Sequence, residues 1–330
     1  MANDVIVNIR LIKPAGKGDL WFPLLYVIKG EGEEDSYKEY STLDDVLEDY
    51  EAETDAYKVA NLIFMQDDAP EKIAICVGAE ENKGEALKAH IAKNWRQVIV
   101  LGDFDSALAS YIETTDRMYF AHFASVEALT AVSETIKEFD RTFAVVYSNE
   151  NVAYPEAAIV GATAGLKAGS FTYKNMIIKG VSAMDISDAD LKAIHDAGGN
   201  TIVEKVGDIV TSEGIVVSGE YADIIDSKDY IIQNITYKTQ KVFNNNKKVP
   251  YTNTGIAMLE AATLEALLDG YNNGMIADNE DGSPAYEVNF ALRTQTTETD
   301  RYERDYPYGK FAFVLAGAIH KATINGEIRF

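Results

Sequence analysis

The sequence has few cysteines and histidines and little positive charge. Its 330 residues include one cysteine, Cys76, so no disulfide can form within the chain, as is typical of proteins that fold in a reducing compartment. Cys76 lies within the apolar run 73–77, where we expect a buried thiol rather than a reactive one. Lysine and arginine total 30 against 53 acidic residues, which gives a formal net charge of -23. Because so acidic a surface repels phosphate groups, we exclude nucleic acid and membranes as partners.

Motifs that carry enzymatic chemistry are also missing. The glycine run 161–169 lacks the Gly-Lys-Ser/Thr ending of a phosphate-binding loop, and no Gly-x-Ser-x-Gly sequence marks a nucleophile. The four histidines show no metal-ligand spacing. The acidic cluster 278–281 lacks the full pattern of a calcium-binding loop. The sequence therefore predicts no catalytic residues, no metal site and no cofactor, which argues against an enzyme.

Long apolar segments are missing as well. The first residues, Met-Ala-Asn-Asp, lack the basic start and apolar run of a signal peptide. The longest apolar stretch, 311–319, is too short to cross a bilayer. We therefore expect a chain that is made and folded in the cytoplasm of the cell that produces it.

Hydrophobic periodicity predicts a mixed α/β fold. Between residues 56 and 147, patterns typical of helices alternate with short apolar runs typical of strands. Such alternation favours a mostly parallel β-sheet flanked by helices. The second half differs, because it carries two long helical patterns, expected at 224–242 and 254–271, and a strand-like run at 170–178. The charged residues at 295–305 are expected to form a loop.

Both ends of the chain have the pattern of isolated β-strands. Apolar and polar residues alternate over 4–13 and again within 311–330, which places one apolar set on one face of each strand. A lone strand leaves its backbone N–H and C=O groups unpaired, so it is suited to pairing with another chain. The residues expected to carry this pairing are Val5, Val7, Ile9, Leu11, Phe311, Phe313, Leu315, Ile319, Ile324 and Ile328. The pattern indicates an assembly protein.

The second half also contains short motifs in a characteristic order. They are Gly-Ser-Phe-Thr-Tyr-Lys at 169–174, Ile-Lys-Gly-Val at 178–181, the segment 188–200, Ser-Gly-Glu-Tyr-Ala-Asp-Ile-Ile at 218–225, Lys-Val-Pro-Tyr-Thr-Asn-Thr-Gly-Ile at 248–256 and Leu-Ala-Gly-Ala-Ile-His-Lys-Ala-Thr-Ile-Asn-Gly at 315–326. Over nearly its whole length the chain resembles the tail sheath proteins of contractile-tailed bacteriophages and phage-tail-like particles, in particular a compact group of them. The acidic segment 31–55 and the loop 295–305 have no counterpart in that pattern.

The resemblance implies a division of the chain into arms and core. The expected units are an N-terminal arm and linker at 1–19, an α/β sheath domain at 20–165, a C-terminal core with two long helices at 166–308 and a C-terminal β-arm at 309–330. The arms would add strands to the sheets of neighbouring subunits. Hinges beside the arms are expected at Pro14, Gly16, Gly18, Pro307 and Gly309. A helix facing the tail tube is expected to present Gly255, Glu260, Glu265 and Asp269.

The resemblance also implies a function and a set of partners. The subunit would polymerise into a helical or stacked-ring sheath around a tail tube, and contraction without nucleotide hydrolysis would drive the tube through a target envelope. Its partners would be further copies of itself, the tail tube protein, and the baseplate and tail terminator proteins. It would be located in a virion tail or a phage-tail-like particle after assembly in the bacterial host cytoplasm. The alternative is a cytosolic α/β enzyme whose active site the motifs do not reveal.

Overall fold

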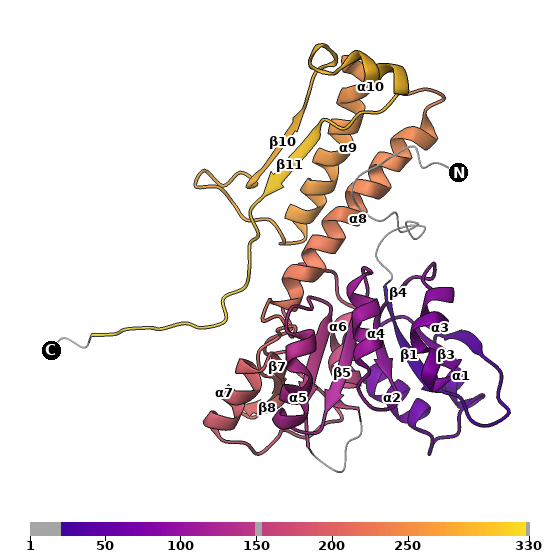
Figure 1. The fold of residues 1–330 in the computed structure, drawn as a ribbon. Coiled ribbons are helices and arrows are strands. Elements are labelled where there is room, and N and C mark those ends of the chain that lie inside the picture. The colour runs from indigo at the N-terminus through magenta and orange to yellow at the C-terminus, as the bar shows by residue number, and fades with distance from the viewer. Residues whose placement is uncertain (1–20, 149–153, 328–330) are drawn as a thin grey trace.

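The structure, a computed structural model, describes residues 21–148 and 154–327, and its centre is a seven-stranded β-sheet (Figure 1). Across the sheet the strands follow the order β2-β3-β1-β4-β5-β6-β7. Neighbouring strands are parallel except at one edge, where β2 runs antiparallel to β3. The strands are β1 (Phe22–Ile28), β2 (Ser36–Tyr40), β3 (Ile73–Gly78), β4 (Trp95–Val100), β5 (Met118–Phe123), β6 (Thr142–Val146) and β7 (Gly199–Asn200).

The inner strands of this sheet are buried on both faces. Every residue of β3 and of β4 is buried. A parallel sheet is covered on both faces, and its strands therefore appear in the sequence as continuous apolar runs. The predicted α/β fold with a mostly parallel sheet is confirmed.

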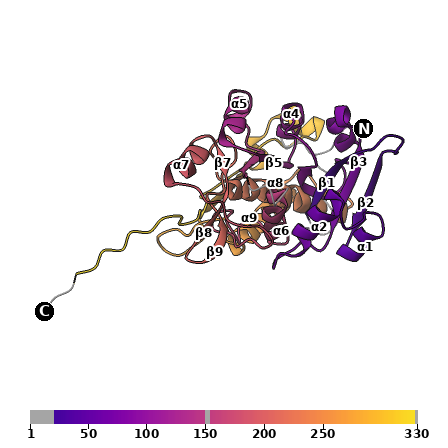
Figure 2. The same ribbon diagram turned by 90° about the horizontal axis from the view of Figure 1, so that it is seen from below.

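Helices cover the two faces of the sheet in two layers. Figure 2 shows α4, α5 and α7 on one side of the sheet and α1, α2 and α6 on the other. The first layer consists of α3 (Lys83–Ala89), α4 (Ser106–Glu113), α5 (Val126–Ile136) and α7 (Asp188–Asp196). The second consists of α1 (Leu43–Leu47), α2 (Asp55–Phe64) and α6 (Pro155–Ala164). The short elements η1 (Glu80–Asn82), β8 (Ile202–Lys205) and β9 (Asp208–Thr211) complete the region, and we call residues 21–221 the α/β body.

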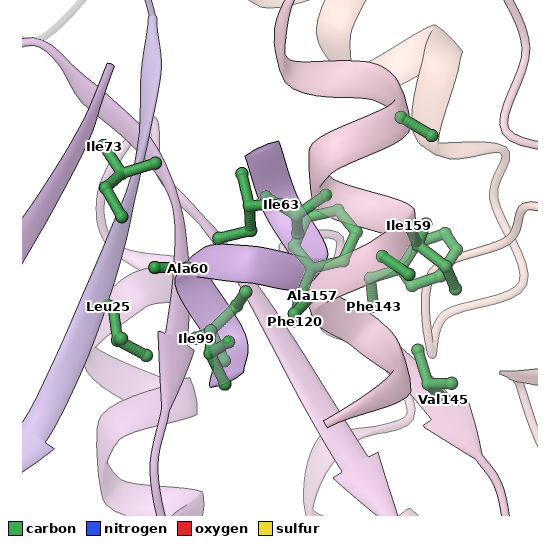
Figure 3. Packing of buried hydrophobic residues seen from close by; sticks show 14 of the residues in the cluster. Leu25, Ala60, Ile63, Ile73, Ile99, Phe120, Phe143, Val145, Ala157 and Ile159 are labelled. Atoms are coloured by element: carbon green, nitrogen blue, oxygen red, sulfur yellow. The ribbon is translucent and has the colours of Figure 1, made fainter. Parts of the chain in front are cut away.

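The glycine run considered as a phosphate loop has a packing role instead. Figure 3 shows Ala60 and Ile63 of α2 beside Ala157 and Ile159 of α6. Gly161 continues this contact, because a Cβ atom there would lie 2.5 Å from the backbone oxygen of Ile63. Only glycine lets the two helices approach so closely, so the first glycine of the run belongs to the core.

The second half adds an elongated outer lobe, defined as residues 222–316. Helices α8 (Ala222–Asn245) and α9 (Asn253–Asn272) project together from the body, and β10 (Tyr286–Phe290) pairs antiparallel with β11 (Gly309–Phe313) beside α9 (Figure 1). Its core is a small cluster formed by Ile231, Ile235, Ala266, Leu267, Met275 and Ile276. Within residues 21–148 and 154–327, no helix combines the length and apolar character needed to span a bilayer.

Two local predictions are wrong. Residues 170–178 form no strand, since Asn175 has a left-handed backbone (φ 59°) and the segment joins β9 through an isolated bridge at Ile177. The charged stretch 295–305 is not a plain loop, because it contains α10 (Glu298–Glu303), which follows η2 (Arg293–Gln295). The α10 helix begins at the N-cap residue Thr297, whose side chain accepts a hydrogen bond from the backbone N–H of Asp300.

Candidate assembly surface

The β10–β11 sheet is the part of the described structure best suited to receive a further strand. It contains two strands, in the register Tyr286↔Phe313 to Phe290↔Gly309, and no other strand of residues 21–148 and 154–327 pairs with it. A two-stranded sheet is only marginally stable in water, and an open edge offers unpaired N–H and C=O groups to another chain. Both outer edges of this sheet are therefore candidate docking sites.

The first part of the predicted C-terminal arm is bonded to its own lobe. Phe311 and Phe313 lie in β11, and Phe313 packs against the lobe core. After the strand, the Val314 N–H donates to the Ala285 oxygen at 2.9 Å, and the Ala316 N–H donates to the Met275 oxygen at 2.8 Å. Leu315 lies between them in an isolated bridge with Ile276. The role of Phe311, Phe313 and Leu315 in pairing with another subunit stays a prediction.

The chain leaves the molecule after His320. Residues 318–327 form neither helix nor strand, and Figure 1 shows the end of this segment running away from the body and the lobe. Ile319 is 91% exposed and Ile324 is 93% exposed. An extended segment that forms no helix or strand and exposes apolar side chains to water has the properties of a strand donor.

The predicted hinge residues are only partly described. Pro307 lies between α10 and β11, and Gly309 is the first residue of β11, where an added Cβ atom would come within 2.7 Å of the Phe290 ring. Gly317, which the sequence analysis did not single out, has a left-handed backbone (φ +63°) and open space around it. The predicted arm and hinge residues that lie outside the described residues are Val5, Val7, Ile9, Leu11, Pro14, Gly16, Gly18 and Ile328.

The predicted tube-facing residues all lie on α9. Gly255 is buried in its first turn, where a Cβ atom would collide with the Pro250 oxygen. Glu260 is half-buried, and Glu265 is exposed. Lys238 of α8 forms ion pairs with Glu265 at 2.5 Å and with Asp269 at 2.9 Å. These two carboxylates therefore tie α9 to α8, and contact with a tube remains a prediction.

A buried ion-pair network fastens the outer lobe to the body. Arg96 of β4 donates from Nε to Asp226 Oδ1 at 2.9 Å and from Nη1 to Asp229 Oδ2 at 2.7 Å. Arg141 donates to both oxygens of Asp229, at 2.7 and 2.9 Å. The Tyr173 hydroxyl donates to Asp226 Oδ2 at 2.8 Å. Because Asp226 and Asp229 lie one turn apart on α8, both carboxylates face the body.

The burial of this network makes its pairing essential. Arg96, Asp226 and Asp229 are 4%, 7% and 4% exposed. Burial opposes ionisation of Asp229, but the charges of Arg96 and Arg141 outweigh it and hold the pKa of this carboxyl below its usual value. The sequence motifs do not predict this network, because two carboxylates on a helix are common in a chain with 53 acidic residues. Their position beside Ile225 on the apolar stripe was the available signal.

Comparison with known proteins gives matches in structure alone. No protein-family model and no curated protein matches the sequence. A chain from the contracted sheath complex of the PVC extracellular contractile injection system matches with a TM-score of 0.72 at 10% identity, over 99% of this chain and 98% of that chain. A chain from the contracted helical sheath of the anti-feeding prophage matches with a TM-score of 0.68 at 13% identity, over 97% and 95%. The sheath tail protein from Listeria innocua gives 0.58 at 8% identity, over 84% and 90%.

The matches to the two contracted sheaths cover nearly the whole chain. They agree with the resemblance drawn from the sequence motifs, although identity is low throughout. This chain has the fold of the contractile tail sheath proteins.

Proposed function

We propose that this chain is the structural subunit of a contractile tail sheath. The observation that carries the proposal is the match of nearly the whole chain to chains from two contracted sheaths. Those neighbours are structural proteins, and this chain shares their combination of an α/β body with an outer lobe. Neither the body alone nor a single motif would support the proposal as strongly.

The subunits join by strand addition at the β10–β11 sheet. One neighbour supplies its C-terminal arm from residues 318–330, and another supplies its N-terminal arm from residues 4–13. Each added strand gives main-chain hydrogen bonds, and its alternate side chains fix the register. The contact is heterologous, because the donated arm and the receiving edge are different surfaces, so it propagates into a polymer instead of closing as a dimer.

The polymer surrounds a tail tube and contracts without nucleotide hydrolysis to drive the tube through a target envelope. A rearrangement that buries more surface between bodies gains a few kcal/mol per subunit, which becomes large when summed over a sheath. The partners are further copies of the chain, the tube protein, and the baseplate and tail terminator proteins of a virion tail or phage-tail-like particle. Contact with the tube is polar and breakable, and α9 is the helix expected to provide it.

Electron microscopy of the purified protein tests the proposal directly. We expect hollow cylinders from the full chain and none from a variant that lacks residues 1–13, which should remain folded by circular dichroism. Uniform small particles of the full chain at high concentration would contradict sheath assembly. Normal cylinders from the truncated chain would remove the N-terminal arm from the proposal while leaving the fold assignment unchanged.

The rival function is an α/β enzyme, and one feature bears on it. A groove of about 450 Å³ between the body and the outer lobe is lined in part by Arg96, Asp226 and Lys238. Arg96 pairs with Asp226 and Lys238 pairs with Asp269, and the two ion pairs account for these four charged groups without catalysis. Among the described residues, no three His, Cys, Asp or Glu side chains are placed to hold a metal ion together. A particle that stays monodisperse at every concentration would favour the enzyme.

A further inference from the structure

His320 attaches the C-terminal segment to the α/β body. Of residues 316–327, all are exposed except His320, which is half-buried. His320 Nε2 forms a hydrogen bond with Thr172 Oγ1 at 3.0 Å. The same ring meets the Tyr221 ring edge-on, with centroids 4.6 Å apart and an interplanar angle of 85°. The adjacent Ile319 is 91% exposed, so the polar residue is held while the apolar one points into solvent.

Both partners of His320 belong to rigid parts of the molecule. Thr172 precedes Tyr173, which is 0% exposed and is bonded to Asp226 of the buried network. Tyr221 is the N-cap residue of α8 and precedes Ala222, which is also 0% exposed. His320 is therefore held by side chains whose backbones are fixed in the core.

The C-terminal segment is held at Ala316 and at His320, with a glycine between these two residues. Its root is held to the outer lobe by the hydrogen bond from Ala316 to Met275, at 2.8 Å. Gly317 follows with φ +63° and open space around it, a conformation that favours glycine. A groove of about 240 Å³, lined in part by Gly317 and Ala318, lies beside this stretch, so the chain is not packed tightly between its two attachments.

We propose that His320 is a positioning residue that fixes the point and direction at which the C-terminal arm leaves the subunit. The anchored arm presents Ile319 and Ile324 to a neighbouring subunit, and this role rests on the sheath function proposed above. A free arm loses conformational freedom when it pairs with another chain, whereas an anchored arm has already lost part of it. The anchor therefore speeds and strengthens strand addition.

The rate of tryptic cleavage after Lys321 measures how often the segment around His320 is released from the body, in the full-length chain before assembly. Thr172→Val removes the hydrogen bond and Tyr221→Leu removes the ring contact, and neither changes the sequence around the cleavage site. We expect each to raise the cleavage rate about fivefold, and both together roughly tenfold or more. Thr172→Ser keeps the hydroxyl and should restore the wild-type rate. Ser170→Ala, two residues away, serves as the control and should leave the rate unchanged.

An unchanged cleavage rate in the double variant would contradict the proposal that His320 holds the C-terminal segment to the body. Assembly kinetics, followed by light scattering, test whether the anchored arm promotes assembly. The double variant should form cylinders with a half-time several-fold longer, and Thr172→Ser should match the wild type. A freed arm with unchanged assembly kinetics would contradict the positioning role. A wild-type chain that forms no cylinders would contradict the sheath function and the presentation to a neighbour, while the cleavage rates would still decide whether His320 anchors the arm.

Discussion

The α/β body and the outer lobe are built from similar elements but differ in how completely each encloses its own core. The body surrounds a seven-stranded sheet with helices on both faces, and two large clusters of buried side chains fill the layers. The lobe has a two-stranded sheet, one small cluster and open strand edges. A large sheet covered by helices on both faces is stable alone, whereas a two-stranded sheet with open edges gains stability by accepting strands from outside. We therefore expect the body to supply stability, and we propose the lobe as the region that receives added strands.

The largest effect should come from breaking the connection between the two regions. Asp226→Ala removes a carboxylate from buried Arg96 and leaves part of its charge uncompensated, so we expect the free energy of unfolding to fall by about 3 to 5 kcal/mol. Urea denaturation measures this loss. Asp196→Ala, which breaks an exposed ion pair with Lys192, is the control and should change little. Equal losses in both variants would mean that the buried network does not join the regions.

A cavity in the lobe tests whether the two regions unfold separately. Leu267 is 0% exposed in the small lobe cluster, so Leu267→Ala should cost about 2 to 4 kcal/mol. We expect faster amide hydrogen exchange in α8 and α9 and unchanged exchange in β3 and β4 of the body. Faster exchange throughout the chain would show that body and lobe unfold as one cooperative unit and do not differ in local stability.

A buried carboxyl group makes the stability of the body depend on pH. Glu156 is 1% exposed, its Oε2 has no hydrogen-bond partner among the described residues, and burial raises its pKa to about 8. As the pH rises from the ordinary value of 4.5 towards about 8, the unfolded chain loses this proton and the folded chain keeps it, so stability falls. Glu156→Gln should remove this decline and raise stability by roughly 2 to 4 kcal/mol at pH 8. Thermal denaturation at pH 5 and pH 8 measures the effect, and an unchanged decline would show that Glu156 ionises freely in the folded body.

The smallest effect on stability should come from the arm. Ile324→Asp alters a side chain that is 93% exposed, so the melting temperature should stay the same while assembly into cylinders is lost. Asn325→Asp places the same charge one position further, on the other face of an added strand, and should assemble better than Ile324→Asp. Phe313→Asp cannot separate these effects, because Phe313 packs in the lobe of its own subunit. A melting temperature that falls with Ile324→Asp would indicate that the arm belongs to the subunit's own core.

The sequence predicted the body better than the lobe for a physical reason. Apolar runs such as 73–77 and 98–101 indicate strands buried on both faces, and the helix that ends at Phe64 shows a clear apolar stripe. The irregular segment 170–178 imitates a strand in its composition, but the left-handed backbone at Asn175 interrupts it. The buried network joins Arg96 to carboxylates 130 and 133 positions away, and local patterns carry no signal for such contacts.

The amino-acid sequence by itself determined the parallel sheet, the two long helices and the alternation at the C-terminus, because each depends on local periodicity. Only the tertiary structure decided where that alternating segment changes its role. Up to Ala316 it is bonded to its own lobe, at Gly317 it turns, and at His320 it is held to the body before it enters solvent. A period of two fixes which face of a strand is apolar, but it does not fix which chain covers that face.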